Sequence, residues 1–448
     1  MQFLSNFFLL SLLSFQHAFA GWEKSTSKPM LPINDPFYVP PNETEWGSDW
    51  KSEEVGTILR KREVIIGTIL PGSESEAKAY QLLYRTQDLN GKADATVTTI
   101  IIPLEPNLNR VISIQNAYDS PDPNCAPSYG LQSGAQGWGR SWNQVNLAFF
   151  LPYLRKGAVL NIPDYEGSNA AFAVGPQSAY QTLDSIKAAL ASSDYTGITD
   201  NANVIMFGYS GGALATEWAT EFKTEYADDL PIVGAVIGGP PVNIGQTYHS
   251  VNGEKLSQLN VWAMLGLMNA FPEMDEYMRN DLKTEGYQDK KFLHALTRCS
   301  YPGDTLVPDL EFTNISSLFH GGDAFLDIFE QKITEVGVMG LHITPESDPG
   351  YPLVFFYGRK DEVIGPISGV EELITKWKQE TNVDVQDWSK LMPFQDHATA
   401  LLTGLPMSWT WMTNRFCAVE KCKDDVDDVD FGPNMDGQVV FRPSDELR

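Results

Sequence analysis

Residues 204–214, VIMFGYSGGAL, decide the fold. The first four residues are apolar, which is typical of a buried strand, and Ala213–Phe222 continues as an amphipathic helix. Between them lies Gly208-Tyr209-Ser210-Gly211-Gly212, a Gly-x-Ser-x-Gly turn. Such a turn holds a serine hydroxyl clear of the adjoining helix, where a base can take its proton. The stretch therefore predicts a strand–turn–helix unit with Ser210 as a nucleophile.

Alternating strands and helices extend from this unit in both directions. Short apolar runs predict buried parallel strands, and apolar residues at i, i+3, i+4 and i+7 predict helices on the faces of the sheet. Earlier runs separated by Gly, Ser and Asn predict an antiparallel entry. The runs are Val64–Leu70, Ala79–Tyr84 and Ala95–Pro103 for the entry, then Val111–Ile114, Ala158–Ile162, Ile232–Ile237, Leu353–Tyr357 and Val383–Val385, with helices within 180–190, 213–222 and 370–377. We expect a mostly parallel α/β sheet with helices on both faces.

One long segment interrupts the alternation, because Tyr248 to about Leu341 reads as helix and loop without a good strand. We interpret it as an inserted helical cap. Its run Val261–Met268 is apolar almost all round, which is typical of the core of a cap or of a surface that meets an apolar substrate. The predicted divisions are a signal peptide (1–20), an N-terminal arm (21–60), a first core part (61–247), the cap (248–341), a second core part (342–422) and an acidic tail (423–448).

The first twenty residues have the pattern of a secretory signal. An apolar stretch from Phe3 to Phe15 precedes Ala18-Phe19-Ala20, a small-residue pattern of the kind that signal peptidase cleaves. The mature chain is expected to begin near Gly21. No other segment approaches the roughly 20 apolar residues that a membrane span needs, so no transmembrane segment is predicted.

Charge and composition exclude several functions. The chain has 32 Lys and Arg against 58 Asp and Glu, a formal net charge of −26, which repels nucleic acid and anionic membranes. With 42% hydrophobic and 20% charged residues, the composition is that of a globular protein. The acidic stretch Asp424–Asp430 lacks the glycine and closing glutamate of a calcium loop. We expect a soluble, extracellular monomer with no metal or cofactor.

Four cysteines indicate disulfides rather than a metal site, because no Cys-x-x-Cys or histidine cluster accompanies them. They allow three pairings. Cys417 and Cys422 are close enough in sequence to close a small loop, which would leave Cys125 to pair with Cys299. The sequons that begin at Asn42 and Asn314 predict glycosylation and agree with secretion.

The base and acid are expected after the serine, in the order serine, acid, histidine. Asp361 follows the strand run Leu353–Tyr357 through a turn, and His397 comes just past the last predicted strand. Rival acids and rival histidines remain in the sequence. The rival acids are Glu362, Asp384 and Asp396, and the other histidines that follow the serine are His249, His294, His320 and His342.

An acyl-transfer transition state also needs donors for its oxyanion. The backbone N–H of Gly211, directly after the nucleophile, is suitably placed, and such a donor is worth about 3 kcal/mol. The segment Asn116–Ser120 follows an early strand and is the candidate for the second donor. A carboxylate would repel an oxyanion, so Asp119 could serve through its backbone or as a protonated acid with a raised pKa.

These residues resemble the fungal secretory lipases, typified by those of Candida yeasts and by lipase A of Candida antarctica. The resemblance runs through most of the mature chain. The matching segments are Tyr118-Asp119, 125–129 (CAPSY), 163–167 (PDYEG), Gln177-Ser178, 183–186 (LDSI), 208–212 (GYSGG), 238–240 (GGP), 361–363 (DEV) and 397–399 (HAT).

The resemblance implies the α/β-hydrolase fold, a cap over a tunnel for an acyl chain, and a Ser210–Asp361–His397 triad. It also implies that Asp119 and Gly211 border the oxyanion hole, and it is consistent with a Cys125–Cys299 disulfide. The implied reaction is hydrolysis of acylglycerols or other lipophilic esters, at a lipid–water interface in the case of a lipase. The cap carries the fewest matching residues.

Three alternatives to a lipase remain. The same family includes esterases that remove short acyl groups from secondary metabolites, such as trichothecene deacetylases. A serine peptidase on this fold would need a propeller, for which the chain has no repeated sequence. A binding module that has lost its chemistry would not need the complete triad.

Overall fold

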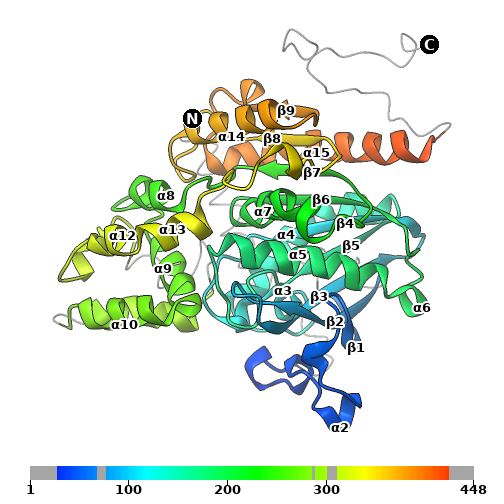
Figure 1. The fold of residues 1–448 in the computed structure, drawn as a ribbon, viewed down its shortest axis with the longest axis horizontal. Helices are drawn as coiled ribbons and strands as arrows, with labels where there is room; N and C mark the ends of the chain where they lie inside the picture. The colour runs from blue at the N-terminus through cyan, green and yellow to red at the C-terminus, as the bar shows by residue number, and fades with distance from the viewer. Residues whose placement is uncertain (1–27, 68–76, 285–287, 300–309, 423–448) are drawn as a thin grey trace, which may run out of the picture.

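The computed structural model describes residues 28–67, 77–284, 288–299 and 310–422, and within them nine strands form one sheet in the order β1-β2-β3-β5-β4-β6-β7-β8-β9 (Figure 1). The predicted signal peptide (1–20) and acidic tail (423–448) lie outside these residues. The strands are β1 (Ile58–Val64), β2 (Ala77–Gln87), β3 (Ala93–Pro103), β4 (Asn107–Gln115), β5 (Ala158–Pro163), β6 (Asn203–Tyr209), β7 (Ile232–Gly238), β8 (Leu353–Phe356) and β9 (Val385–Asp387).

The first three strands form the expected antiparallel entry, and β3 also runs antiparallel to β5. One boundary was wrong, because the first strand is Ile58–Val64 and ends where the predicted run Val64–Leu70 begins; residues 68–70 of that run lie outside the described residues. Its sequence ILRKREV is highly charged, as is common on an edge strand. Arg62 forms an ion pair with Asp35 at 2.6 Å and Arg60 one with Glu45 at 2.9 Å. The N-terminal arm thus provides partners for charges that would otherwise disfavour a strand.

From β5 onward each neighbouring pair of strands is parallel, which confirms the predicted fold class. Helices cover both faces of the sheet (Figure 1). The helices α5 (Gly175–Leu190), α7 (Gly211–Tyr226) and α14 (Ile367–Glu380) contribute to the core on one face, and α4 (Trp138–Arg155) and α15 (His397–Glu420) contribute to the core on the other. Shorter helices are α2 (Glu43–Trp46), α3 (Pro127–Gly130) and α6 (Ser193–Thr196).

The cap lies at one side of the sheet (Figure 1). Its helices surround a separate apolar core, and the run Val261–Met268 is largely buried there on α9. Gly266 lets α9 pack directly on the backbone of Phe172, because a Cβ at this glycine would overlap that backbone. The helices are α8 (Ile244–Val251), α9 (Gln258–Ala270), α10 (Pro272–Asp281), α11 (Gln288–His294), α12 (Ala324–Ile328) and α13 (Glu330–Gly337). The cap and the core are therefore in direct contact at the 171–174 loop.

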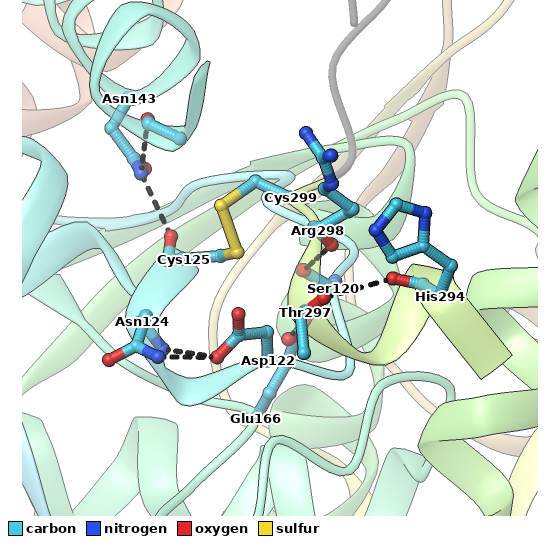
Figure 2. Close-up of a disulfide and its surroundings, with 11 residues drawn as sticks. Ser120, Asp122, Asn124, Cys125, Asn143, Glu166, His294, Thr297, Arg298 and Cys299 are labelled. Atoms are coloured by element: carbon cyan, nitrogen blue, oxygen red, sulfur yellow. Dashed lines mark hydrogen bonds between the residues drawn. A yellow bond between two sulfur atoms is a disulfide. The ribbon is translucent and has the colours of Figure 1, made fainter. Parts of the chain in front are cut away.

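The cysteines form one disulfide rather than two. Cys125 is bonded to Cys299, which ties the cap to the loop after β4 (Figure 2). The predicted Cys417–Cys422 disulfide is absent, and both residues are free thiols at the end of α15. Arg110 lies beside both thiols, with its Nη2 3.6 Å from Sγ of Cys417 and 3.1 Å from Sγ of Cys422. In the described ranges no helix is long and apolar enough to cross a membrane.

Candidate active site

Ser210 lies at the tight junction between β6 and α7. Its backbone has a φ of 56° and a ψ of −124°, a conformation that is strained for a residue with a side chain. The turn is possible because a Cβ at Gly208 would overlap the Gly212 carbonyl, and one at Gly212 would overlap the Gln115 carbonyl. The two glycines therefore hold Ser210 at the carboxyl end of the parallel strands, above the sheet.

His397 is the histidine that the fold brings to Ser210. It is the first residue of α15, and its Nε2 lies 2.9 Å from Oγ of Ser210. The backbone of His397 is fixed at both polar groups: its N–H donates to Glu362 at 3.0 Å, and its carbonyl accepts from the Tyr209 hydroxyl at 2.5 Å. The side chain is only 14% exposed. These contacts hold the imidazole in one position beside the serine.

The other histidines that follow the serine lie elsewhere. The ring of His342 packs against Trp218 and Phe222, on the face of the sheet that α7 covers. The remaining three, His249, His294 and His320, belong to the cap or its connecting segments.

Asp361 is the acid that contacts His397. Its Oδ2 lies 2.8 Å from Nδ1 of the imidazole, and its Oδ1 accepts the backbone N–H groups of Val363 and Ile364. The side chain is fully buried. A carboxylate bound in this way holds the ring nitrogens in a fixed arrangement, with Nδ1 toward the acid and Nε2 toward the serine.

The rival acids have other partners. Glu362 binds the backbone of His397 rather than its ring. Asp396 caps α15 by accepting the Thr399 N–H at 2.8 Å, and Asp384 accepts the side chain of Gln386 at 3.3 Å. The structure thus joins Ser210, His397 and Asp361 in one chain of hydrogen bonds.

Electrostatics favour a basic imidazole. Burial disfavours the charged form of His397, but the charge of Asp361 and the hydrogen bond to it outweigh burial, so the pKa of His397 is raised above its usual value. A positive charge on this imidazole would therefore be stabilised by the neighbouring Asp361 carboxylate.

Gly211 and Asp119 lie together beside the serine. Gly211 is the first residue of α7, and the first N–H groups of a helix have no intrahelical acceptor. The Asp119 carboxyl lies against its Cα, so closely that a Cβ on Gly211 would overlap Oδ1 of Asp119. Oδ1 is buried without a hydrogen-bond partner, and burial raises the pKa of Asp119 from 3.8 to about 7, although the charge of His397 opposes this. The site thus holds, beside a helix N-terminus, an acid that is mostly neutral below pH 7.

An apolar pocket leads from Ser210 into the cap. The space between its walls, its open mouth included, is about 690 Å³. Asp119, Ser210 and Gly211 line one end, and the remainder is mostly apolar. The apolar lining includes Phe172, Leu259, Ala263, Met264, Leu267, Phe325 and Ile333. The apolar run on α9 is therefore both part of the cap core and a wall of the pocket.

Two features of the site were not predicted from the sequence. Tyr209 reaches past the serine to hold the His397 carbonyl, and the loop that carries Phe172 and Ala173 forms part of the pocket wall. Tyr209 occupies the variable position of the Gly-x-Ser-x-Gly motif, where no spacing rule assigns it a role. Ala173 has a φ of 68°, which its sequence context does not reveal.

The comparisons with known proteins agree with this geometry. The model of the secretory lipase family matches residues 134–423. A secreted triacylglycerol lipase of Malassezia globosa is 31% identical over 413 residues, which cover 92% of this chain and 86% of the relative. A trichothecene C-3 esterase of Fusarium sporotrichioides is 34% identical over 375 residues, covering 79% and 78%.

A solved structure has the same overall fold. Candida antarctica lipase A in its closed state aligns with a TM-score of 0.72 at 25% identity and covers 88% of each chain. Together with the family match and the two relatives, this confirms the resemblance stated from the motifs. The chain belongs to the secretory lipase family of carboxylic-ester hydrolases.

Proposed function

We propose that this protein hydrolyses esters of lipophilic acids through an acyl-enzyme on Ser210. His397 takes the Ser210 proton as its Oγ attacks the ester carbonyl, and Asp361 orients the imidazole and stabilises its charged form. The imidazolium then protonates the leaving alcohol, and water releases the acid by the same route in reverse. The observation that carries this proposal is the hydrogen-bonded chain from Ser210 through His397 to Asp361 at the end of an apolar pocket.

We assign the oxyanion hole to the N–H of Gly211 and the protonated side chain of Asp119. The backbone N–H of Ser120 donates to the Glu166 carboxyl at 3.3 Å, so it is already engaged within the protein. A carboxyl that is neutral below a raised pKa of about 7 can donate a hydrogen bond to the oxyanion in that pH range, as Asp119 would here.

The nucleophile can be tested directly. Ser210→Ala is expected to lower kcat by about 10⁶ on a p-nitrophenyl ester. A fluorophosphonate probe should label the wild-type protein at Ser210 and leave the variant unlabelled. Activity retained by Ser210→Ala would remove both the nucleophile and the acyl-enzyme from the proposal, and labelling without turnover would favour a binding module.

The pocket supports a long acyl chain as the preferred group. Its walls are mostly apolar side chains from α9, α12 and α13, which would bury methylene groups at about 0.8 kcal/mol each. On a series of p-nitrophenyl esters from acetate to palmitate, kcat/KM is expected to rise with chain length until the pocket is filled. An emulsified triacylglycerol should then be hydrolysed at a lipid–water interface.

A short-chain deacetylase is the second candidate. It is favoured by the trichothecene C-3 esterase of Fusarium sporotrichioides, which is as similar to this chain as the lipase relative is. In that case the chain-length series would peak at acetate on a soluble alcohol, and cleavage would occur without an interface. Peptide substrates should not be cleaved in either case.

We also propose that the protein is secreted as a monomer, with its signal peptide removed after Ala20 and glycans on Asn42 and Asn314. The signal-like first twenty residues, the Cys125–Cys299 disulfide and the secreted relative support this. Both asparagines are exposed. Mass spectrometry of protein from culture medium, before and after deglycosylation, and size-exclusion chromatography test these proposals. Limited proteolysis tests the proposed boundaries of the arm (21–60), the core (61–247 and 342–422) and the cap (248–341).

A further inference from the structure

The loop that carries Asp119 has a backbone conformation that needs support. Asp119 has a φ of 44°, in the left-handed region that residues with side chains rarely adopt. A conformation of this kind is unfavourable and persists where the surroundings determine it. The side chain of Asp119 acts as an oxyanion donor only if this backbone stays fixed against Gly211. The support for the loop is therefore part of the catalytic geometry.

The side chain of Glu166 supplies part of that support. Its carboxyl is fully buried, and Oε2 accepts the N–H of Ser120 at 3.3 Å. Burial, and next the charge of Asp119, raise the pKa of this carboxyl well above its usual value, and the nearby backbone N–H of Asp119 opposes that shift. Successive backbone N–H groups around a residue with positive φ form a concave nest that binds an anionic or acceptor group. Here the group in the nest comes from the protein itself, so the turn at Asp119 is held by a side chain from the loop after β5.

The loop around Glu166 is itself rigidly held. The backbone N–H of Glu166 donates to the Tyr118 hydroxyl at 2.8 Å. The backbone carbonyl of Glu166 accepts the Ala171 N–H at 2.8 Å and the Gln177 side chain at 3.1 Å. The rings of Tyr118 and Tyr165 pack edge to face with centroids 5.1 Å apart. Two hydrogen bonds thus join the 118–120 and 165–166 segments. The Tyr118 hydroxyl accepts the Glu166 N–H, and the Glu166 carboxyl accepts the Ser120 N–H.

The other side of the Asp119 loop is held by the cap. The Ser120 hydroxyl donates to the Arg298 carbonyl at 3.1 Å, next to the Cys125–Cys299 disulfide (Figure 2). Asn269 on α9 donates to the carbonyls of Pro121 and Ala170. Backbone carbonyls and a disulfide on this side restrain the loop but bind neither N–H of the turn. Among these contacts, Glu166 alone binds a backbone N–H of the turn at Asp119, that of Ser120.

We propose that Glu166 is a positioning residue for the oxyanion hole, which acts by holding the Asp119–Ser120 turn in its catalytic conformation. This inference rests on the proposed role of Asp119. Glu166 touches neither the substrate nor the reacting atoms, and it is not among the residues that line the pocket. Its loss should therefore slow acylation without weakening the binding of the acyl chain.

The test compares Glu166→Ala with Glu166→Gln. Active sites are counted with a fluorophosphonate, and kcat is expressed per labelled Ser210. Since one oxyanion donor is worth about 10²–10³ in kcat, Glu166→Ala is expected to lose about 10–100-fold in kcat with KM within about twofold. Glu166→Gln keeps an oxygen acceptor for the Ser120 N–H and should restore kcat to within about threefold. The Ki of a trifluoromethyl ketone, a mimic of the tetrahedral intermediate, should rise in step with the loss of kcat/KM.

Asp184 provides the matched control. Its carboxyl is equally buried, but it binds Thr86 and Tyr226, away from the Asp119 loop. Asp184→Ala should lower the Tm while kcat per labelled site stays unchanged. If Glu166→Ala does not fold, Tyr118→Phe replaces it, because it removes the hydroxyl that holds the Glu166 backbone, and a several-fold loss of kcat at constant KM is expected.

The outcomes separate this inference from the proposed function. A per-site kcat within twofold of wild type in Glu166→Ala, or in Tyr118→Phe where the first variant does not fold, would overturn the positioning role. So would a Glu166→Gln variant as slow as Glu166→Ala. In both cases loss of activity in Ser210→Ala would still support the acyl-enzyme. Retained activity in Ser210→Ala would instead contradict the proposed function itself.

Discussion

The carboxyl group of Asp119 lies against the Cα of Gly211, on the side where any other residue would place its Cβ. The contact joins the loop after β4 to the first turn of α7. It follows from the sheet, because β4 and β6 are parallel neighbours with Gln115 paired to Gly208, so the segments that leave their carboxyl ends meet. The two candidate oxyanion donors are therefore brought together by strand order, although more than 90 residues separate them in the sequence.

Gly211→Ala should disrupt this contact and leave the fold intact. The new methyl group would overlap the Asp119 carboxyl and displace it, and we expect kcat to fall about 10²-fold, the value of one oxyanion donor. Gly245→Ala is the control, since Gly245 lines the same pocket but its Cβ would meet only Oδ1 of Asn243, at 3.3 Å. Steady-state kinetics of both variants on a soluble ester check the prediction, and equal losses in the two would contradict it.

Asp119→Asn should broaden the pH range of activity. The pKa of the wild-type carboxyl is about 7, so the neutral donor is lost as the pH rises above 7 and the ionised form repels the oxyanion. An amide does not ionise, and the alkaline limb of kcat/KM should move to higher pH.

The measurement is kcat/KM on a soluble ester from pH 5 to 9. At pH 6, where the wild-type acid is mostly neutral, the Asn variant should remain within about tenfold of wild type because its amide still donates. If the alkaline limb lies at the same pH in Asp119→Asn as in wild type, that limb belongs to a group other than Asp119.

The fold was predictable where local pattern and burial coincide. The strands β4 to β8 are apolar runs buried on both faces, and their cores were found within a few residues. The first strand was misplaced because its charged residues are stabilised by partners in the N-terminal arm, which a local pattern does not reveal. No helix was predicted after His397, since α15 contains Pro406 and lacks a clear apolar stripe. Its stability comes from packing on the sheet.

The site was predictable where chain order constrains it. Each residue of the triad, Ser210, Asp361 and His397, follows a parallel strand. Its place at the carboxyl edge of the sheet could therefore be inferred from that strand alone. Glu166 also follows a strand, β5, yet its role depends on a positive φ at Asp119 in a different loop. Backbone conformation of this kind is set by tertiary contacts, and no spacing in the sequence reports it. The predicted Cys417–Cys422 disulfide was also wrong, and no spacing in the sequence shows that Arg110 on β4 lies beside both thiols.

Asp361→Asn and Glu362→Gln together should show which of the two residues is the acid that orients His397. Replacing a carboxylate that holds a catalytic histidine by an amide favours the wrong tautomer and costs about 10⁴ in kcat. Glu362→Gln should cost less than about tenfold, since Glu362 binds the backbone N–H of His397 and an amide oxygen can still accept it. The kcat of each variant, expressed per fluorophosphonate-labelled site, checks the assignment. A larger loss in the Glu362 variant would make Glu362 the acid.

Stability should decrease as the pH rises from acidic to neutral. Burial raises the pKa values of Asp119, Asp164 and Asp184 from 3.8 to about 7 in the folded protein. A raised folded-state pKa adds stability that is complete below the unfolded value near 4, decreases above it, and is lost once the pH passes about 7. The Tm is therefore expected to be higher at pH 5 than at pH 8.

Asp184→Asn isolates this effect from the general repulsion that a net charge of −26 causes. Because the amide does not titrate, the variant should show a Tm difference between pH 5 and pH 8 that is smaller than that of wild type by roughly 2–4 °C. An identical pH dependence in variant and wild type would mean that Asp184 does not stay protonated in the fold.

Removing the Cys125–Cys299 disulfide should destabilise the protein and loosen the active site. The bond closes a loop across a sequence separation of 174, for which chain entropy gives about 5 kcal/mol of stability. It also anchors the segment whose Arg298 carbonyl accepts the Ser120 hydroxyl, next to Asp119. The double variant Cys125→Ser/Cys299→Ser should therefore lose kcat per labelled site as well as Tm.

The matched double variant Cys417→Ser/Cys422→Ser should change neither by much, because these thiols are free and Arg110 retains its ion pair with Glu420. Thermal unfolding with and without a reductant checks both expectations. The reductant should lower the Tm of the Cys417→Ser/Cys422→Ser protein as much as that of wild type, and it should leave the Tm of the Cys125→Ser/Cys299→Ser protein unchanged.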